Sequence, residues 1–98
     1  MDCKVILSPR AIQDLNEIVR YISLDNPRVA ERFGYALIDA ALSLKNLPER
    51  GHSVPEFDDG VTREIVHGNY RIVYRYDQER KAVWISRFWH AARGTPPL

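Results

Sequence analysis

A few ionisable side chains near the C-terminal end of the chain are of the types that cleave a phosphodiester bond in RNA. That reaction needs a base for the 2′-hydroxyl, cations for the charged phosphorane and an acid for the leaving oxygen. Arg71, Arg75 and Arg93 could supply the cations, and His90 could transfer protons because imidazole titrates near neutrality. The same arginines could instead form ion pairs with Glu64 across neighbouring strands. An RNA-cleaving site and an ionic sheet surface therefore both remain open.

Other catalytic arrangements are missing from the sequence. No serine lies in a nucleophile-elbow motif, and the five glycines are scattered rather than gathered into a phosphate-binding loop. The single cysteine, Cys3, excludes an internal disulfide, and no Cys/His cluster has the spacing of a zinc site. We therefore expect neither a metal nor a cofactor.

Composition favours a small cytoplasmic protein. The chain has 98 residues, 45% of them hydrophobic, which suffices for one compact domain spanning 1–98. One lone cysteine is typical of a reducing compartment. No window reaches the ~18 apolar residues of a membrane span, and the N-terminal stretch MDCKVILSPR carries an acid and lacks a long apolar run. We expect a cytoplasmic location and no membrane partner.

The two parts of the chain differ in charge, although the total is only +1. Residues 1–60 hold 7 Lys/Arg against 10 Asp/Glu, a net of −3, whereas residues 61–98 hold 7 against 3, a net of +4. This asymmetry indicates a basic face for an anionic partner, either a nucleic acid or an acidic protein segment. The alternative is an ordinary sheet surface with arginine-rich edges.

The first half of the chain predicts a strand and two helices. The apolar run CKVILS is followed by Ser8 as a helix cap, and an apolar stripe predicts a helix over about residues 9–24. Asn26 repeats the cap for a second helix, which Pro48 ends. The short turn between them predicts an antiparallel hairpin, with small alanines allowing close approach. Asp14 and Glu17 lie off the stripe, so we expect them to be solvated.

The second half predicts a sheet. Residues 48–60 have no period and are expected to form a surface loop. Gly68-Asn69 separates two alternating runs, and a two-residue turn would oppose Ile65 to Ile72 and Arg63 to Tyr74. The run AVWISRFWH alternates Val83 and Ile85 with Trp84 and Phe88, which is typical of a central strand covered on both sides. The predicted fold is α+β, in the order β-α-α-β-β-β, with a helical hairpin on one face of a mostly antiparallel four-stranded sheet.

The face of this sheet away from the helices is the candidate binding surface. Exposed apolar side chains beside arginines would mark a partner site. The alternative is that the loop 48–60 or the C-terminal tail ARGTPPL folds over them. The candidate binding residues are Arg63, Arg71, Val73, Arg75, Trp84, Trp89 and Arg93.

Four segments together resemble the RelE/ParE family of toxins from bacterial type II toxin–antitoxin modules. They are SPRAIQDLNEIVRYI, NLPERGHSVPE, GVTREIVHGNYRIVYRYD and VWISRFWHAAR, and they cover nearly the whole chain in the family's order. The most specific part is the series Gly60, Arg63-Glu64, Tyr70-Arg71, Tyr74-Arg75 and His90. The chain is more similar to the ParE, or plasmid-stabilisation, branch than to the ribosome-dependent RelE branch.

The resemblance implies a growth-arresting toxin held inactive by a cognate antitoxin, whose acidic segment folds along the toxin in a hetero-oligomer. ParE-type relatives poison DNA gyrase by contact and need no catalytic residues. RelE-type relatives cleave mRNA at the ribosome; for that branch Arg71 matches the phosphate arginine, and His90, with Arg93 nearby, matches an acid/base position. The chain has no tyrosine after Tyr76, which favours the ParE branch. We therefore expect a gyrase-binding toxin; the alternatives are an mRNA endonuclease and a non-toxic module that binds only its antitoxin.

Overall fold

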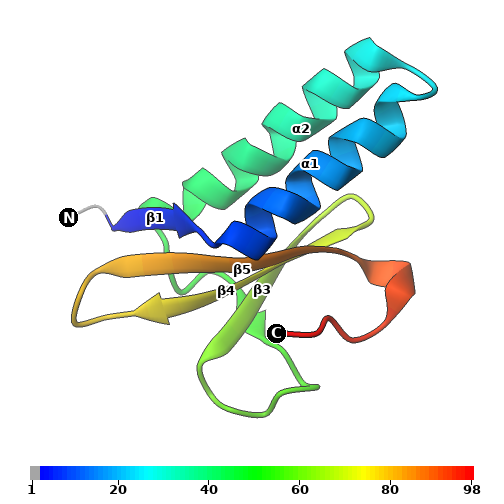
Figure 1. Cartoon of the computed structure of the whole chain (residues 1–98). Helices are drawn as coiled ribbons and strands as arrows, with labels where there is room; N and C mark the ends of the chain where they lie inside the picture. Colours follow the sequence, from blue (N-terminus) through cyan, green and yellow to red (C-terminus); the bar gives the residue numbers. More distant parts are fainter. Residues whose placement is uncertain (1–2) are drawn as a thin grey trace.

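The computed structural model, which describes residues 3–98, is a five-stranded sheet with a helical hairpin on one face (Figure 1). The strand order is β1-β5-β4-β3-β2; β1 pairs with β5 in parallel and the other pairs are antiparallel. The α+β class is as predicted. The elements are β1 (Lys4–Leu7), α1 (Pro9–Ser23), α2 (Pro27–Leu42), η1 (Ser43–Lys45), β2 (His52–Ser53), β3 (Thr62–His67), β4 (Tyr70–Asp77), β5 (Ala82–His90) and η2 (Ala91–Arg93).

The sheet has one strand more than the sequence predicts. His52 and Ser53 form β2, which pairs with Glu64 and Arg63 of β3 inside the segment expected to be a loop. Two residues are too few to show a period, so the pattern of alternation could not reveal this strand. No helix among residues 3–98 has the length and apolar character needed to cross a membrane.

Both predicted helix caps are present. The Ser8 hydroxyl accepts a hydrogen bond from the Ala11 amide at 3.0 Å, and the Asn26 side-chain oxygen accepts one from the Val29 amide at 3.2 Å. Each cap satisfies an amide that lacks a partner in the first turn of its helix. The two helices therefore begin where the sequence predicts.

The second helix ends earlier than Pro48. Helix α2 stops at Leu42 and continues as the 3₁₀ turn η1. The Ser43 hydroxyl donates to the Ala40 carbonyl at 2.6 Å, a local bond that competes with the helical pattern. The Lys45 carbonyl then accepts the Cys3 amide at 2.8 Å, which joins η1 to the start of the first strand.

The hairpin helices also approach each other closely at a glycine, besides the buried alanines Ala30 and Ala41. Gly34 of α2 is buried against α1, where an added Cβ would lie 2.8 Å from Cγ2 of Val19. A side chain at this position would therefore require Val19 or one of the helices to shift. Figure 1 shows the hairpin running past the sheet, so that its turn points away from the strands.

The β3–β4 hairpin has the predicted two-residue turn and the predicted register. His67 opposes Tyr70, Ile65 opposes Ile72, and Arg63 opposes Tyr74. Side chains on alternate residues of these strands face the helices. The core between helices and sheet includes Ile18, Leu37, Ala41, Leu44, Ile65, Ile72, Tyr74, Val83, Ile85 and Phe88.

A bulge in β5 places Phe88 on a different face from the one expected. Val73 pairs with Arg87 and Tyr74 with Ile85, so Ser86 is the extra residue. The Ser86 carbonyl accepts a hydrogen bond from the Ser8 hydroxyl at 3.0 Å. The bulge therefore meets the residue that caps α1, and it turns Phe88 toward the helices instead of onto the face of Trp84.

Candidate functional site

Arg71 lies on the face of the sheet away from the helices, and its guanidinium is fully engaged. It donates to Glu64 from Nε at 2.5 Å and from Nη2 at 3.2 Å. It donates to Glu56 from Nη1 at 2.9 Å and from Nη2 at 3.1 Å, and to the Gly94 carbonyl from Nη1 at 3.2 Å. An arginine side chain has five N–H donors, and all five are used here. No donor of Arg71 is left for a phosphate.

The two carboxylates around Arg71 make this a paired ionic cluster rather than a free positive charge. The side chains of Arg71 and Glu64 are only 12% and 8% exposed. The hydrogen bonds that Arg71 donates, to Glu64 first and then to Glu56, raise its pKa. In return, the hydrogen bond from Arg71 lowers the pKa of Glu56 below its usual value of 4.5. Of the two interpretations of Arg71, the geometry agrees with the ion-paired one.

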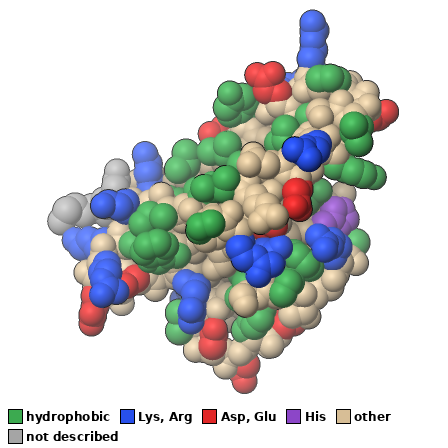
Figure 2. Space-filling view, viewed as in Figure 1, with side chains coloured by type: hydrophobic (Ala, Val, Ile, Leu, Met, Phe, Trp, Pro, Cys, Tyr) green, Lys and Arg blue, Asp and Glu red, His purple; other side chains and the backbone are tan. Residues whose placement is uncertain are grey.

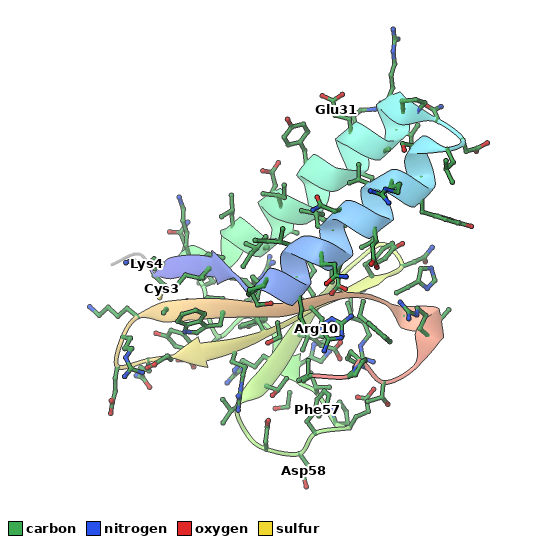
Figure 3. All side chains as sticks on the ribbon, in the orientation of Figure 1. Cys3, Lys4, Arg10, Glu31, Phe57 and Asp58 are labelled. Atoms are coloured by element: carbon green, nitrogen blue, oxygen red, sulfur yellow. The ribbon has the colours of Figure 1, made fainter. Side chains whose placement is uncertain are left out.

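The loop after β2 and the C-terminal tail cover this face of the sheet. Figure 1 shows both segments on the side away from the helices, and Figure 3 shows Phe57 and Asp58 in that loop. Glu56 reaches Arg71 from the loop. In the tail, Pro96 is buried, and the Pro97 carbonyl accepts a hydrogen bond from Arg87 at 2.8 Å.

This cover changes what the candidate binding residues can contact. Val73 and Trp89 were expected to be exposed if the face were open, but they are 0% and 6% exposed. The indole N–H of Trp89 donates to the Gly94 carbonyl at 3.0 Å, the same acceptor that Arg71 uses. Of the three apolar candidates, only Trp84 remains accessible, at 44% exposure.

His90 is on the opposite face of the sheet from Arg71. Tyr70 pairs with His90 and Arg71 pairs with Trp89, and neighbouring residues of a strand point to opposite faces. The His90 ring packs edge-on against Tyr70, with ring centroids 5.0 Å apart. Its Nδ1 accepts a hydrogen bond from the Ala92 amide at 3.1 Å, so the neutral ring carries its proton on Nε2.

A cavity of about 390 Å³ lies beside His90, between α1 and the ends of β4 and β5. Burial raises the pKa of Tyr70 at this cavity. Arg93 also lines the cavity, and its guanidinium carbon lies 4.1 Å from the ring centroid of Trp89. The structure therefore brings His90 and Arg93 to one cavity, whereas the Arg71 side chain lies on the opposite face of the sheet from His90. The cavity is lined by Asp14, Glu17, Ile18, Tyr21, Tyr70, Phe88, His90 and Arg93.

Arg63 and Arg75, the other two arginines among the candidate binding residues, have different environments. Arg63 donates from Nη1 to the Gly51 carbonyl at 2.7 Å and to the Glu49 carbonyl at 3.3 Å, so it holds the segment before β2 against the sheet. The side chain of Arg75 is 54% exposed, and its Nη2 lies 3.9 Å from Oδ2 of Asp59. Arg75 is thus the more accessible of the two.

Asp14 was expected to be solvated, and this was wrong. It is 8% exposed and binds Arg87 through both carboxylate oxygens, at 2.7 Å from Nε and 2.8 Å from Nη2. Its Oδ2 also accepts the Phe88 amide at 3.1 Å, where β5 runs beyond the end of β1. Helical periodicity alone could not find this contact, because the partner is 73 residues away.

Comparison with known proteins places the chain among bacterial toxins. The model of the family described as the ParE toxin of the type II toxin–antitoxin system, parDE, matches residues 5–94. The Toxin RelE1 of Caulobacter vibrioides is 38% identical over 93 residues, which cover 92% of this chain and 95% of that protein.

Solved structures of toxins share the fold. The RelBE2 toxin–antitoxin complex from Mycobacterium tuberculosis contains a chain with 26% identity and a TM-score of 0.69, covering 92% of this chain and 99% of that one. The chromosomal ParDE system of P. aeruginosa gives a TM-score of 0.72 at 18% identity, covering 90% of this chain and 95% of that one. A variant of E. coli RelE with two arginines replaced by alanine, in the free state, gives a TM-score of 0.64 at 17% identity, covering 96% of this chain and 88% of that one. The last two likenesses concern the fold alone.

The family model spans most of the chain, and the identity to Toxin RelE1 extends over nearly the same length. The chain therefore belongs to the ParE toxin family of type II toxin–antitoxin systems, within the RelE/ParE superfamily, and is a toxin of that class.

Proposed function

We propose that this toxin arrests growth by binding and poisoning DNA gyrase, with no catalytic step of its own. The observation that carries the proposal is the placement of the two nuclease-type residues. Arg71 is held by two carboxylates on one face of the sheet, and His90 lies on the other face. A phosphate clamp and a proton-transfer group must reach the same phosphodiester, so these two cannot act together. The match to the ParE family model supports the same choice.

The proposal includes a cognate antitoxin and a cytoplasmic site of action, where gyrase works. The solved complex of the RelBE2 relative supports an antitoxin partner in a hetero-oligomer. The helical hairpin carries large exposed apolar side chains that a partner chain could cover, namely Tyr21 (76%), Leu24 (82%) and Tyr35 (61%). Such positions suit an amphipathic segment that folds as it binds.

The test is the reaction of purified toxin with gyrase and supercoiled plasmid. We expect the toxin to trap gyrase on cleaved DNA, so that linear plasmid appears after detergent and protease treatment. Intact plasmid at saturating toxin would overturn the proposal.

RNA cleavage is the second candidate, and two observations favour it. The relative at 38% identity carries the name Toxin RelE1. The cavity beside His90 also gathers Tyr70 and Arg93, so a proton-transfer group and a cation lie together without Arg71. Sequencing the 5′ ends of ribosome-bound message tests this candidate: cuts by the wild-type toxin that disappear in His90→Ala would establish it in place of gyrase binding.

A further inference from the structure

The two tryptophans of β5 lie on the same face of the sheet but in opposite environments. Trp84 pairs with Arg75 and Trp89 with Arg71, and these two arginines share a face of β4. Trp89 is 6% exposed and its indole N–H is bonded to the tail, whereas Trp84 is 44% exposed. Within residues 3–98 the indole N–H of Trp84 has no hydrogen-bond acceptor. The cover over this face therefore ends before Trp84.

The neighbours of Trp84 form a compact surface, here called the Trp84 surface, consisting of Lys4, Ile6, Arg75 and Trp84. Ile6 of β1 and Arg75 of β4 are the direct cross-strand partners of Trp84. Lys4 is exposed and lies two residues before Ile6, hence on the same face. Figure 2 shows hydrophobic side chains gathered over the end of the sheet where β1 and β5 pair, with Lys and Arg side chains at their border.

The charges at this border are available to a partner. The nearest carboxylate to Arg75 is Asp59, at 3.9 Å, which is too far for a hydrogen bond. Asp77 on the same face is instead bound to Arg80 at 3.0 Å. Arg75 can therefore bind a carboxylate from another molecule without first breaking a strong contact.

We propose that the Trp84 surface is where the toxin binds its protein target, DNA gyrase, at an apolar pocket bordered by carboxylates. The inference rests on the proposed function and assigns it a contact surface. Tryptophan and arginine are the residues most enriched at the energetic centres of protein interfaces. The backbone of both residues is held on paired strands, so binding costs little backbone freedom. Lys4 and Arg75 favour an acidic partner surface.

A nucleic acid fits this surface less well than a protein does. A phosphodiester chain brings a negative charge with every nucleotide, and Asp59 and Asp77 stand beside Arg75 and Trp84. A protein surface can instead place carboxylates against Lys4 and Arg75 and none against the two aspartates. The acids at the border therefore favour a protein partner.

The experiment compares Trp84→Ala and Arg75→Glu with the control Val29→Ala in the gyrase reaction. Val29 is exposed to a similar extent as Trp84, at 40%, and lies in the first turn of α2, at the far end of the hairpin. We expect Trp84→Ala and Arg75→Glu to raise the toxin concentration for half-maximal plasmid linearisation at least tenfold, and Val29→Ala to change it less than twofold. Circular dichroism should show all three folded, with melting temperatures near that of the wild type.

Three results would overturn the inference. If wild-type toxin linearises the plasmid and both variants do so equally well, gyrase binding stands but the Trp84 surface is not its site. If wild-type toxin never linearises it, the proposed function fails and the inference with it. If the wild type binds a short fluorescein-labelled single-stranded RNA without gyrase, and Trp84→Ala abolishes this, the surface belongs to a nucleic acid.

Discussion

Arg71 and His90 occupy neighbouring cross-strand pairs of β4 and β5, and their side chains lie on opposite faces of the sheet. The sequence alone gives no distance between them. The register places them on opposite faces, because side chains of neighbouring cross-strand pairs alternate between the two faces of a sheet. Arg71 is therefore better described as the centre of an ionic cluster that ties the loop and the tail to the sheet.

Arg71→Ala is predicted to act on stability. Removing the guanidinium takes both hydrogen bonds from the buried Glu64 and leaves it the exposed His52 ring at 3.5 Å, which costs roughly 3–5 kcal/mol of unfolding free energy. Urea unfolding followed by tryptophan fluorescence measures the loss. The matched control is Arg71→Met combined with Glu64→Leu, which removes both charges and should cost less than Arg71→Ala alone. An Arg71→Ala protein as stable as the wild type would contradict the role given to the cluster.

The Asp14–Arg87 pair gives a second prediction. Asp14→Ala should lower the unfolding free energy by roughly 3–5 kcal/mol, because a buried arginine loses both of its carboxylate bonds and the Phe88 amide loses its acceptor. Glu17→Ala, one turn further along α1 and exposed, should change it by less than about 0.5 kcal/mol. Equal effects of the two substitutions in chemical denaturation would show that the pair contributes little.

Tyr74 links the segment before β2 to the core. Its hydroxyl accepts the Gly51 amide at 2.9 Å and donates to the Pro48 carbonyl at 2.7 Å, while its ring is fully buried. Tyr74→Phe leaves the Gly51 amide without an acceptor and should cost roughly 1–3 kcal/mol. Tyr35→Phe, at an exposed position, is the control and should be neutral. Hydrogen exchange at Gly51 should quicken in Tyr74→Phe; unchanged protection there would argue against the link.

Asp59 predicts a dependence of stability on acid. Hydrogen bonds from the Thr62 hydroxyl and amide and from the Val61 amide lower its pKa from 3.8 to about 2. Because the folded-state pKa lies below the unfolded one, this stabilisation is fully present above pH 3.8 and is lost as the pH falls toward 2. Asp59→Asn should therefore be less stable than the wild type at pH 7, and the difference should shrink between pH 4 and 2. A constant difference across that range, measured by urea unfolding, would contradict the assignment.

Local sequence signals predict the fold well where a capping or turn residue stands at the end of a periodic run of apolar residues. Ser8 and Asn26 cap the helices as expected, and Gly68-Asn69 fixes the register of the hairpin. These features depend on residues close in sequence, so they can be recognised without knowing the tertiary structure. The two-residue strand β2 and the bulge at Ser86 depend on partners far along the chain, and no local period reveals them.

The candidate site shows the same division. Arginines and tryptophans near the C-terminal end were identified as binding residues from their types alone. Which of them are accessible depends on where Gly94 and Pro97 of the tail come to lie, and this is a tertiary contact. Arg71, Val73 and Trp89 are consequently covered, while Arg75 and Trp84 are left open.

The claim that growth arrest comes from binding and not from cleavage is tested most directly by the growth of cells expressing His90→Ala. His90 is the proton-transfer candidate named from the sequence, it lines the cavity together with Arg93, and it has no part in the proposed poisoning of gyrase. We predict that folded His90→Ala toxin arrests growth as fully as the wild type at matched expression. Normal growth with folded His90→Ala, alongside arrest by the wild type, would contradict the account.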